Sequence, residues 1–98
     1  MLYKNRKMSQ SEIDEVYEDF VIEIASKVAK KVKGKVFYGY ANIEDMWYIL
    51  VKTRELGEKR FFLDTLTYDM MNGVSSKEIS DNIIKIYRRI IERRFFII

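Results

Sequence analysis

The chain has 98 residues, of which 48% are hydrophobic and 34% charged, and its formal net charge is +3. These values fit one globular domain, residues 1–98, rather than a disordered chain. Because the sequence contains neither cysteine nor histidine, disulfides, thiolate metal sites and nucleophiles activated by histidine are excluded. Only a metal site made of carboxylates stays open, and it requires Asp and Glu side chains to converge. We therefore expect no cofactor, no bound metal and no catalytic residues, and predict that the protein is not an enzyme.

The first predicted element is a long amphipathic helix. Residues 1–8 are expected to form a loose basic arm, and Ser9 and Glu12 then have the spacing of a capping box. Apolar residues follow at steps of three and four, and Gly34 stands where such a helix ends. Acidic residues come early in this segment and lysines late, an order that complements the helix dipole. The apolar stripe comprises Ile13, Val16, Tyr17, Phe20, Val21, Ile24, Ala25, Val28 and Val32.

Strand-forming residues dominate the middle of the chain. Trp47, Ile49 and Val51 alternate along the second strand candidate, which predicts a central position in the sheet. Short connections favour an antiparallel meander. The third candidate leaves an alternative open, in which residues 66–71 form a short helix ended by Asn72-Gly73. The three strand candidates are residues 35–41, 46–53 and 60–67.

The last predicted element is a second long helix, and it completes the expected fold. Ser75 and Glu78 repeat the capping-box spacing. Both long helices need a surface that buries their apolar stripes, and the sheet is the available partner. We therefore predict an α+β fold of order α-β-β-β-α, with a three-stranded antiparallel sheet and both helices packed on one face; the sequence leaves open which face this is. The apolar stripe of the last helix comprises Ile79, Ile83, Ile86, Tyr87, Ile90, Ile91 and Phe95.

Positive charge is concentrated in the last helix. Residues 74–98 contain six basic and three acidic side chains, a net charge of +3. Such a helix can bind nucleic acid by releasing counterions from phosphates. It can equally be a solvated face whose bases lie near the negative end of the helix dipole, and we favour this second interpretation. The candidate nucleic-acid contacts are Lys85, Arg88, Arg89 and Arg93, together with Lys4, Arg6 and Lys7 of the arm.

Aromatic residues cluster on the predicted sheet. With helices on one face only, some of the rings must lie on the other face, and exposed apolar patches usually indicate association. We favour a protein partner or self-association over burial or the stacking of bases. The chain also ends in Phe95-Phe96-Ile97-Ile98, which either covers the core or serves as a binding handle. The candidate partner contacts are Trp47, Tyr48, Phe61, Arg88 and Arg89, because aromatic and Arg side chains dominate interface energetics.

Several segments carry a resemblance to a group of known proteins. The run 37–45 follows an acidic-to-basic helix, and Asn72-Gly73-Val74-Ser75-Ser76 leads into the basic helix that reaches Phe95-Phe96. This order resembles small uncharacterised proteins encoded by phages and prophages of low-GC Gram-positive bacteria. The resemblance implies a viral accessory protein that binds and blocks a host protein, such as a bacterial defence complex.

The leading functional prediction is therefore a non-enzymatic protein-binding module with a host protein as its partner. A phage-type inhibitor with anti-CRISPR-like action is one form of it. The alternative is a small nucleic-acid-binding protein that uses the basic last helix, and a homodimer also stays open. No apolar run approaches the roughly 18 residues of a membrane span, so we expect no membrane partner and a cytoplasmic location in a bacterial host.

Overall fold

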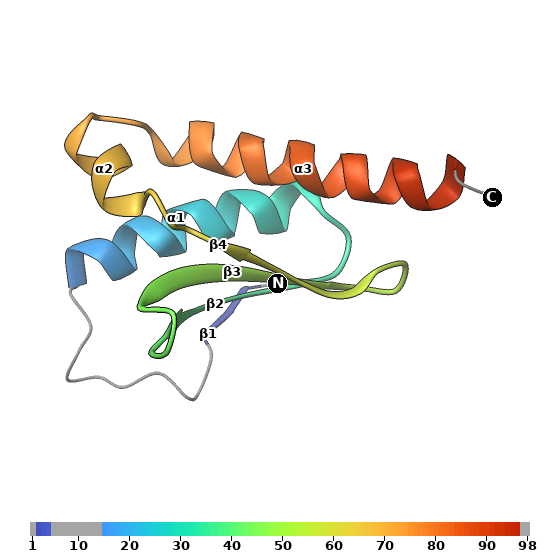
Figure 1. Cartoon of the computed structure of the whole chain (residues 1–98), viewed down its shortest axis with the longest axis horizontal. Helices are drawn as coiled ribbons and strands as arrows, with labels where there is room; N and C mark the ends of the chain where they lie inside the picture. The colour runs from blue at the N-terminus through green and yellow to red at the C-terminus, as the bar shows by residue number, and fades with distance from the viewer. Residues whose placement is uncertain (1, 5–14, 97–98) are drawn as a thin grey trace.

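The computed structural model describes residues 2–4 and 15–96 and places the side chains of residues 15–93. Figure 1 shows one sheet with both long helices on the same side of it. This arrangement confirms the predicted α+β class, the antiparallel meander and the placing of both helices on one face. The elements, in chain order, are β1 (Leu2–Lys4), α1 (Glu15–Lys31), β2 (Lys35–Ala41), β3 (Met46–Thr53), β4 (Gly57–Phe62), α2 (Leu66–Met71) and α3 (Ser76–Phe96).

The sheet has four strands in the order β1-β2-β3-β4, rather than the three that the sequence predicted. The additional strand, β1, pairs in parallel with β2, and Tyr3 lies opposite Phe37. Residues 2–4 were predicted to belong to a loose arm, and that prediction is wrong. The outer edge of β2 would otherwise present unpaired N–H and C=O groups, and even a short strand satisfies some of them.

The third strand and the helix after it also differ from the leading prediction. Strand β4 begins at Gly57 and ends at Phe62, five residues before the predicted end. Residues 66–71 form the helix α2, the alternative that the sequence had left open, and Gly73 follows it with φ +72°. The backbone N–H of Leu63 still donates to the carbonyl of Trp47 at 2.8 Å. Helix α2 ends at Met71, because the Asn and Gly that follow it are strong signals of a helix end.

The hydrophobic core lies between the helices and the sheet. Ile24 and Ala25 of α1 are fully buried, and so are Ile49 and Val51 of β3. Strand β3 is central, with β2 and β4 on its two sides, as the alternation of Trp47, Ile49 and Val51 had predicted. Each fully buried aliphatic side chain contributes about 1.5–3 kcal/mol. The core also contains Val21, Val28, Val36, Tyr38, Trp47, Leu66, Ile79, Ile83, Ile84 and Tyr87.

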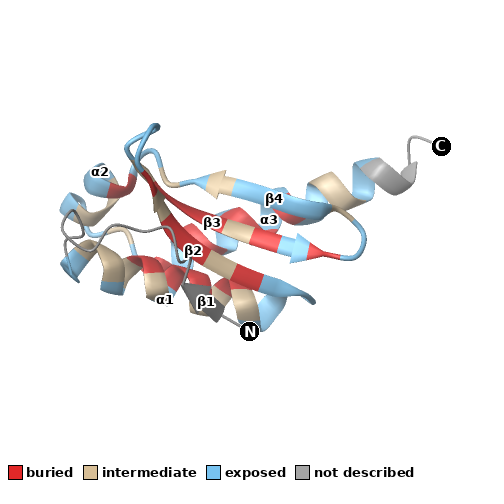
Figure 2. Cartoon of the chain, turned by 90° about the horizontal axis from the view of Figure 1, so that it is seen from below, coloured by how far each residue is buried: buried red, intermediate tan, exposed pale blue. Residues whose placement is uncertain are grey.

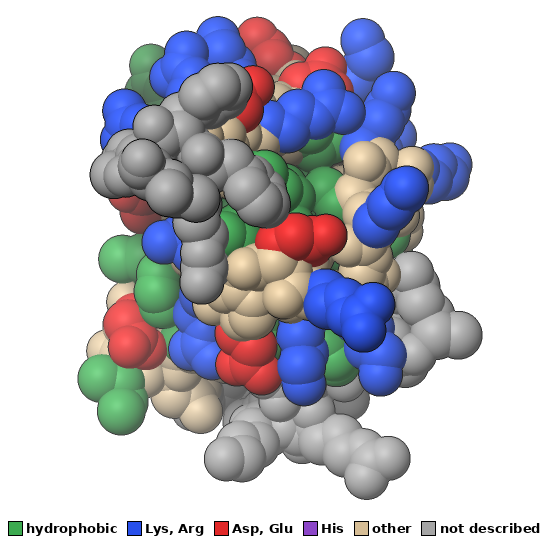
Figure 3. All heavy atoms as spheres, turned by 90° about the vertical axis from the view of Figure 1, so that its right-hand side faces the viewer, with side chains coloured by type: hydrophobic (Ala, Val, Ile, Leu, Met, Phe, Trp, Pro, Cys, Tyr) green, Lys and Arg blue, Asp and Glu red, His purple; other side chains and the backbone are tan. Residues whose placement is uncertain are grey.

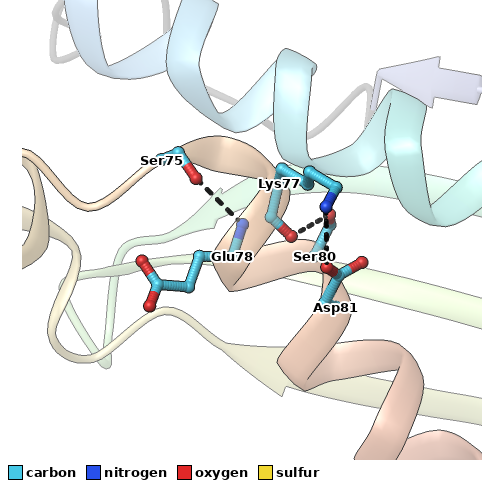
Figure 4. Close-up of polar contacts among 5 residues, drawn as sticks. All are labelled: Ser75, Lys77, Glu78, Ser80 and Asp81. Atoms are coloured by element: carbon cyan, nitrogen blue, oxygen red, sulfur yellow. Dashed lines mark hydrogen bonds and ion pairs between the residues drawn. The ribbon is translucent and has the colours of Figure 1, made fainter.

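Two local features fix the starts of β2 and α3. Gly34 has φ +147°, and a Cβ atom there would lie 2.5 Å from the carbonyl oxygen of Lys52. Only glycine fits this close approach. At the start of α3, the backbone N–H of Glu78 donates to Ser75 Oγ at 3.1 Å (Figure 4), which confirms Ser75 as the N-cap. The other predicted capping pair, Ser9 and Glu12, lies outside the described residues.

Candidate nucleic-acid interface

The two faces of the sheet divide the aromatic cluster that the sequence had singled out. Tyr38 lies opposite Ile49, which lies opposite Phe61, and all three point toward the helices. Because side chains alternate along a strand, Tyr48 and Phe62 point to the opposite face. That face is the one seen in Figure 2, where β3 and β2 carry most of the buried positions and β4 is largely exposed. The aromatic residues therefore do not form one exposed patch.

The predicted aromatic partner contacts are largely buried. Trp47 is 7% exposed, and its ring meets that of Tyr40 edge-on at 5.5 Å between centroids. Phe61 is half-buried against the core. Tyr48 is only 4% exposed, and the guanidinium of Arg60 lies 4.3 Å from its ring centroid. Trp47 and Tyr48 are therefore buried where we had expected exposed rings, and Phe61 is partly buried; their role as partner contacts stays a prediction.

The basic side chains of α3 are exposed, and the structure places them beside a second basic set. Helices α1 and α3 lie side by side and run in the same direction (Figure 1). Three adjoining hollows of about 420, 390 and 300 Å³ follow the line between the second half of α1 and α3. We call this surface the basic groove. Its basic lining residues are Lys27, Lys30, Lys31, Lys33, Lys77, Lys85, Arg88 and Arg89.

The basic groove carries a strong excess of positive charge. Eight basic and three acidic side chains line it, and the acidic ones are Glu55, Asp81 and Glu92. Asp81 Oδ2 lies 3.9 Å from Lys77 Nζ, an exposed pair within α3 (Figure 4). Figure 3 looks at the end of the molecule where α1 ends, and many blue Lys and Arg side chains lie there, with some red Asp and Glu side chains between them. Clustered like charges of this kind attract a polyanion.

Seven of the acidic side chains lie at the other end of the molecule. The start of α1, the turn between β2 and β3, helix α2 and the start of α3 all lie at the left of Figure 1. Those segments contain Glu15, Glu18, Asp19, Glu44, Asp45, Asp69 and Glu78. The modest net charge of +3 therefore hides a separation of charge along the molecule.

The lysines of α1 are the residues that sequence reasoning missed. They had been assigned only to the helix dipole, although Lys27, Lys30 and Lys31 have the same spacing as Lys85, Arg88 and Arg89. Residues at i, i+3 and i+4 share one face of a helix. The repeated triplet could have been noticed in the sequence. That the two triplets share one groove depends on how the helices pack, which the sequence does not state.

Four other predicted contacts lie apart from the groove lining or outside the described residues. Arg93 is exposed on α3, beyond the lining residues, and Lys4 belongs to β1. Arg6 and Lys7 lie outside the described residues, as do the side chains of 94–98. The question of whether Phe95-Phe96-Ile97-Ile98 is buried or a binding handle therefore falls outside the described part of the chain.

Tyr38 is the titratable residue whose environment changes its chemistry. Burial in the core raises the pKa of the Tyr38 phenol above its usual range, and the negative charge of Glu18 raises it further. The phenol donates to Glu18 Oε1 at 3.4 Å and links β2 to the first half of α1. Within residues 15–93, no group of three or more Asp or Glu side chains is arranged to hold a metal ion.

None of the described helices combines the length and the apolar character that crossing a membrane requires. Comparison with protein-family models, with curated proteins and with solved structures found no match.

Proposed function

We propose that this protein binds nucleic acid, and that the basic groove contacts the phosphate backbone. One observation carries the proposal: two helices bring their basic triplets, Lys27/Lys30/Lys31 and Lys85/Arg88/Arg89, to a single surface. The basic residues of the groove are exposed apart from Lys27, which is half-buried. They can therefore reach phosphate oxygens without any change of fold.

The physical basis of the proposed binding is the release of counterions. Each Lys or Arg that neutralises a phosphate displaces condensed cations, so affinity falls steeply as salt is added. Contacts of this kind position a protein on nucleic acid without reading its sequence. We therefore expect binding that depends little on sequence, with a dissociation constant of about 10⁻⁴ to 10⁻⁶ M at physiological salt.

Fluorescence anisotropy tests this function directly. Labelled single- and double-stranded oligonucleotides are titrated with the protein at low and then at moderate salt. We expect micromolar binding at low salt that weakens steeply as the salt concentration rises. Absence of binding at low salt, or an affinity that does not change with salt, would overturn the proposal.

Binding to a host protein is a second proposal, and a different observation favours it. Side chains that the basic groove does not use expose apolar surface: Ile86 is 47% exposed, Tyr68 67% and Met71 81%. They lie on α2 and α3, away from the aromatic positions that the sequence had suggested. A continuous apolar patch formed by such side chains would support association with a protein. An inhibitor of a bacterial defence complex is the form that we propose.

A restriction assay tests the second proposal. The chain is expressed in a bacterium whose defence system destroys an incoming plasmid, and transformation by that plasmid is counted. An inhibitor restores transformation, whereas an unchanged count across the main defence types contradicts the proposal.

A further inference from the structure

Another hollow lies near the start of α3, away from Arg88 and Arg89 in the second half of that helix. It has a volume of about 240 Å³ and is bounded by the end of β4, by α2 and by α3. We call it the apolar hollow. Ile79, Ile83 and Ile86 line its α3 side, while Asp64 and Asp69 line it near α2. This surface shares no residue with the basic groove.

The apolar lining follows the spacing of a helix that packs against another helix. Ile79, Ile83 and Ile86 stand at i, i+4 and i+7 and form one stripe of about two turns on α3. Ile79 and Ile83 are 9% and 5% exposed, whereas Ile86 at the end of the stripe is 47% exposed. The stripe is therefore only partly covered within the described chain.

The hollow opens to solvent beside α3 at the end of β4. Figure 2 shows α3 running behind β4, so the sheet itself is covered there. Five of the six β4 residues are exposed, and the hollow lies where this strand ends. A short amphipathic helix can lie along the exposed side of α3 at this point.

The negative charge around the apolar hollow favours a positively charged binding partner. Asp64 and Asp69 are its charged lining residues, and no Lys or Arg side chain from the described part of the chain lines it. Thr65 Oγ1 donates to Asp69 Oδ2 at 2.9 Å and holds that carboxylate in place at the start of α2. An acidic rim complements lysines or arginines and repels carboxylates.

We infer that the apolar hollow docks a cationic amphipathic helix of a partner protein. The helix places an apolar side chain against Ile86, the exposed end of the stripe, and directs Lys or Arg toward Asp64 and Asp69. This inference rests on the second proposal, binding to a host protein, and names the site and the partner chemistry for it.

A synthetic peptide of about 15 residues, with Leu at helical spacing and Lys elsewhere, is the probe. It is titrated into protein whose isoleucine methyl groups are labelled for NMR. We expect saturable shifts at Ile79, Ile83 and Ile86. A peptide of the same composition in scrambled order, and one with Glu in place of Lys, are expected to bind at least about tenfold more weakly. Equal binding by either control peptide, or no shifts at these three residues, would overturn the inference.

Substitutions in and away from the hollow test whether the peptide binds there. Ile86→Asp is expected to weaken binding about tenfold or more. Ile43→Asp is the matched control, because Ile43 is 96% exposed in the turn between β2 and β3, and it should leave binding unchanged. Asp64→Lys is expected to lower affinity for the Lys peptide and raise it for the Glu peptide. Equal effects of Ile86→Asp and Ile43→Asp would contradict the proposed position.

Two further measurements separate this inference from the proposal on which it rests. If wild type and Ile86→Asp restore plasmid transformation equally, the hollow is the wrong site while protein binding stands. If wild type has no effect in that assay, the second proposal fails whatever the peptides do. The remaining alternative is that a second copy of the chain occupies the hollow, and sedimentation of the free protein tests it. A dimer that Ile86→Asp converts to a monomer would show that a second copy fills the hollow, and would overturn the inference.

Discussion

The two long helices have an inner surface that stabilises the fold and an outer surface that we propose to bind nucleic acid. The inner surface, which faces the sheet, is apolar and buried, with Val21, Ile24 and Val28 of α1 fully enclosed. The outer surface carries the basic groove, in which exposed lysines and arginines lie next to one another. Burial of apolar area stabilises the fold, whereas clustered like charges add nothing to it. Substitutions on the inner surface should therefore change stability, and those on the outer surface should change binding.

The largest effect on stability is expected from Ile24→Ala. Ile24 is one of the two fully buried isoleucines of the described chain, so the substitution leaves a cavity between α1 and the sheet. The expected loss is about 2–5 kcal/mol, measured by urea unfolding. A loss below about 0.5 kcal/mol would show that α1 is not packed on the sheet as described.

Gly34→Ala tests the junction between α1 and β2. A Cβ atom at position 34 would lie 2.5 Å from the Lys52 carbonyl oxygen and 2.9 Å from Thr53 Cγ2, with φ at +147°. Backbone strain alone costs about 1–3 kcal/mol, and the collision adds to it. Gly57→Ala is the matched control, because a Cβ at Gly57 meets nothing within 4 Å although φ is +67° there. Equal losses in the two variants would contradict the close approach at Gly34.

Ser75→Ala tests how much the N-cap of α3 contributes to stability. The substitution removes the acceptor of the Glu78 N–H, and the expected cost is about 1 kcal/mol. Ser75→Asp retains an acceptor and should keep most of the stability. If Ser75→Asp is as unstable as Ser75→Ala in thermal unfolding, the cap does not stabilise α3.

Tyr38 predicts how stability changes at alkaline pH. The folded state raises the phenol pKa above its usual value near 10, so folding favours the neutral form. The stabilisation is fully present below pH 10 and is lost as the pH rises through the folded-state pKa. Wild type should therefore lose stability more steeply above pH 10 than Tyr38→Phe. The free energy of unfolding is measured for both proteins with a denaturant at several pH values. If it changes with pH in the same way in both, the burial of this phenol is contradicted.

The smallest effect on stability is expected on the outer surface. Lys30→Gln combined with Lys31→Gln removes two exposed charges from the basic groove, and the free energy of unfolding should change by no more than about 0.5 kcal/mol. The same variant should bind nucleic acid more weakly. A large loss of stability would mean that these lysines support the fold, and would remove the distinction between the two surfaces.

The inner surface was largely predictable from the sequence, and the outer surface was not. Apolar periodicity predicted α1 and α3, and alternation placed Trp47, Ile49 and Val51 on one face of a central strand. These signals are local, because each lies within one element. The leading prediction of a strand at residues 60–67 was confirmed for residues 60–62 and was wrong beyond Phe62, where the chain leaves the sheet and Leu66 begins α2.

The candidate site depends on contacts between segments that are distant in the sequence. For that reason sequence reasoning grouped residues that lie apart and separated residues that lie together. The aromatic residues were grouped by proximity in sequence, yet Tyr48 and Phe61 lie on opposite faces of the sheet. Conversely, Lys31 and Arg88 are far apart in sequence and line the same hollow. The parallel packing of α1 and α3 determines this, and no local pattern encodes it.

The most direct test of the central claim is the salt dependence of duplex DNA binding in two charge-matched variants. Arg88→Gln with Arg89→Gln removes two charges from the basic groove, while Lys35→Gln with Lys52→Gln removes two from the sheet face away from the helices. We expect the first variant to lower the slope of log Kobs against log salt by about 2 in magnitude, and the second to leave the slope close to that of wild type. Equal slopes in the two variants would contradict a phosphate-binding role for the basic groove.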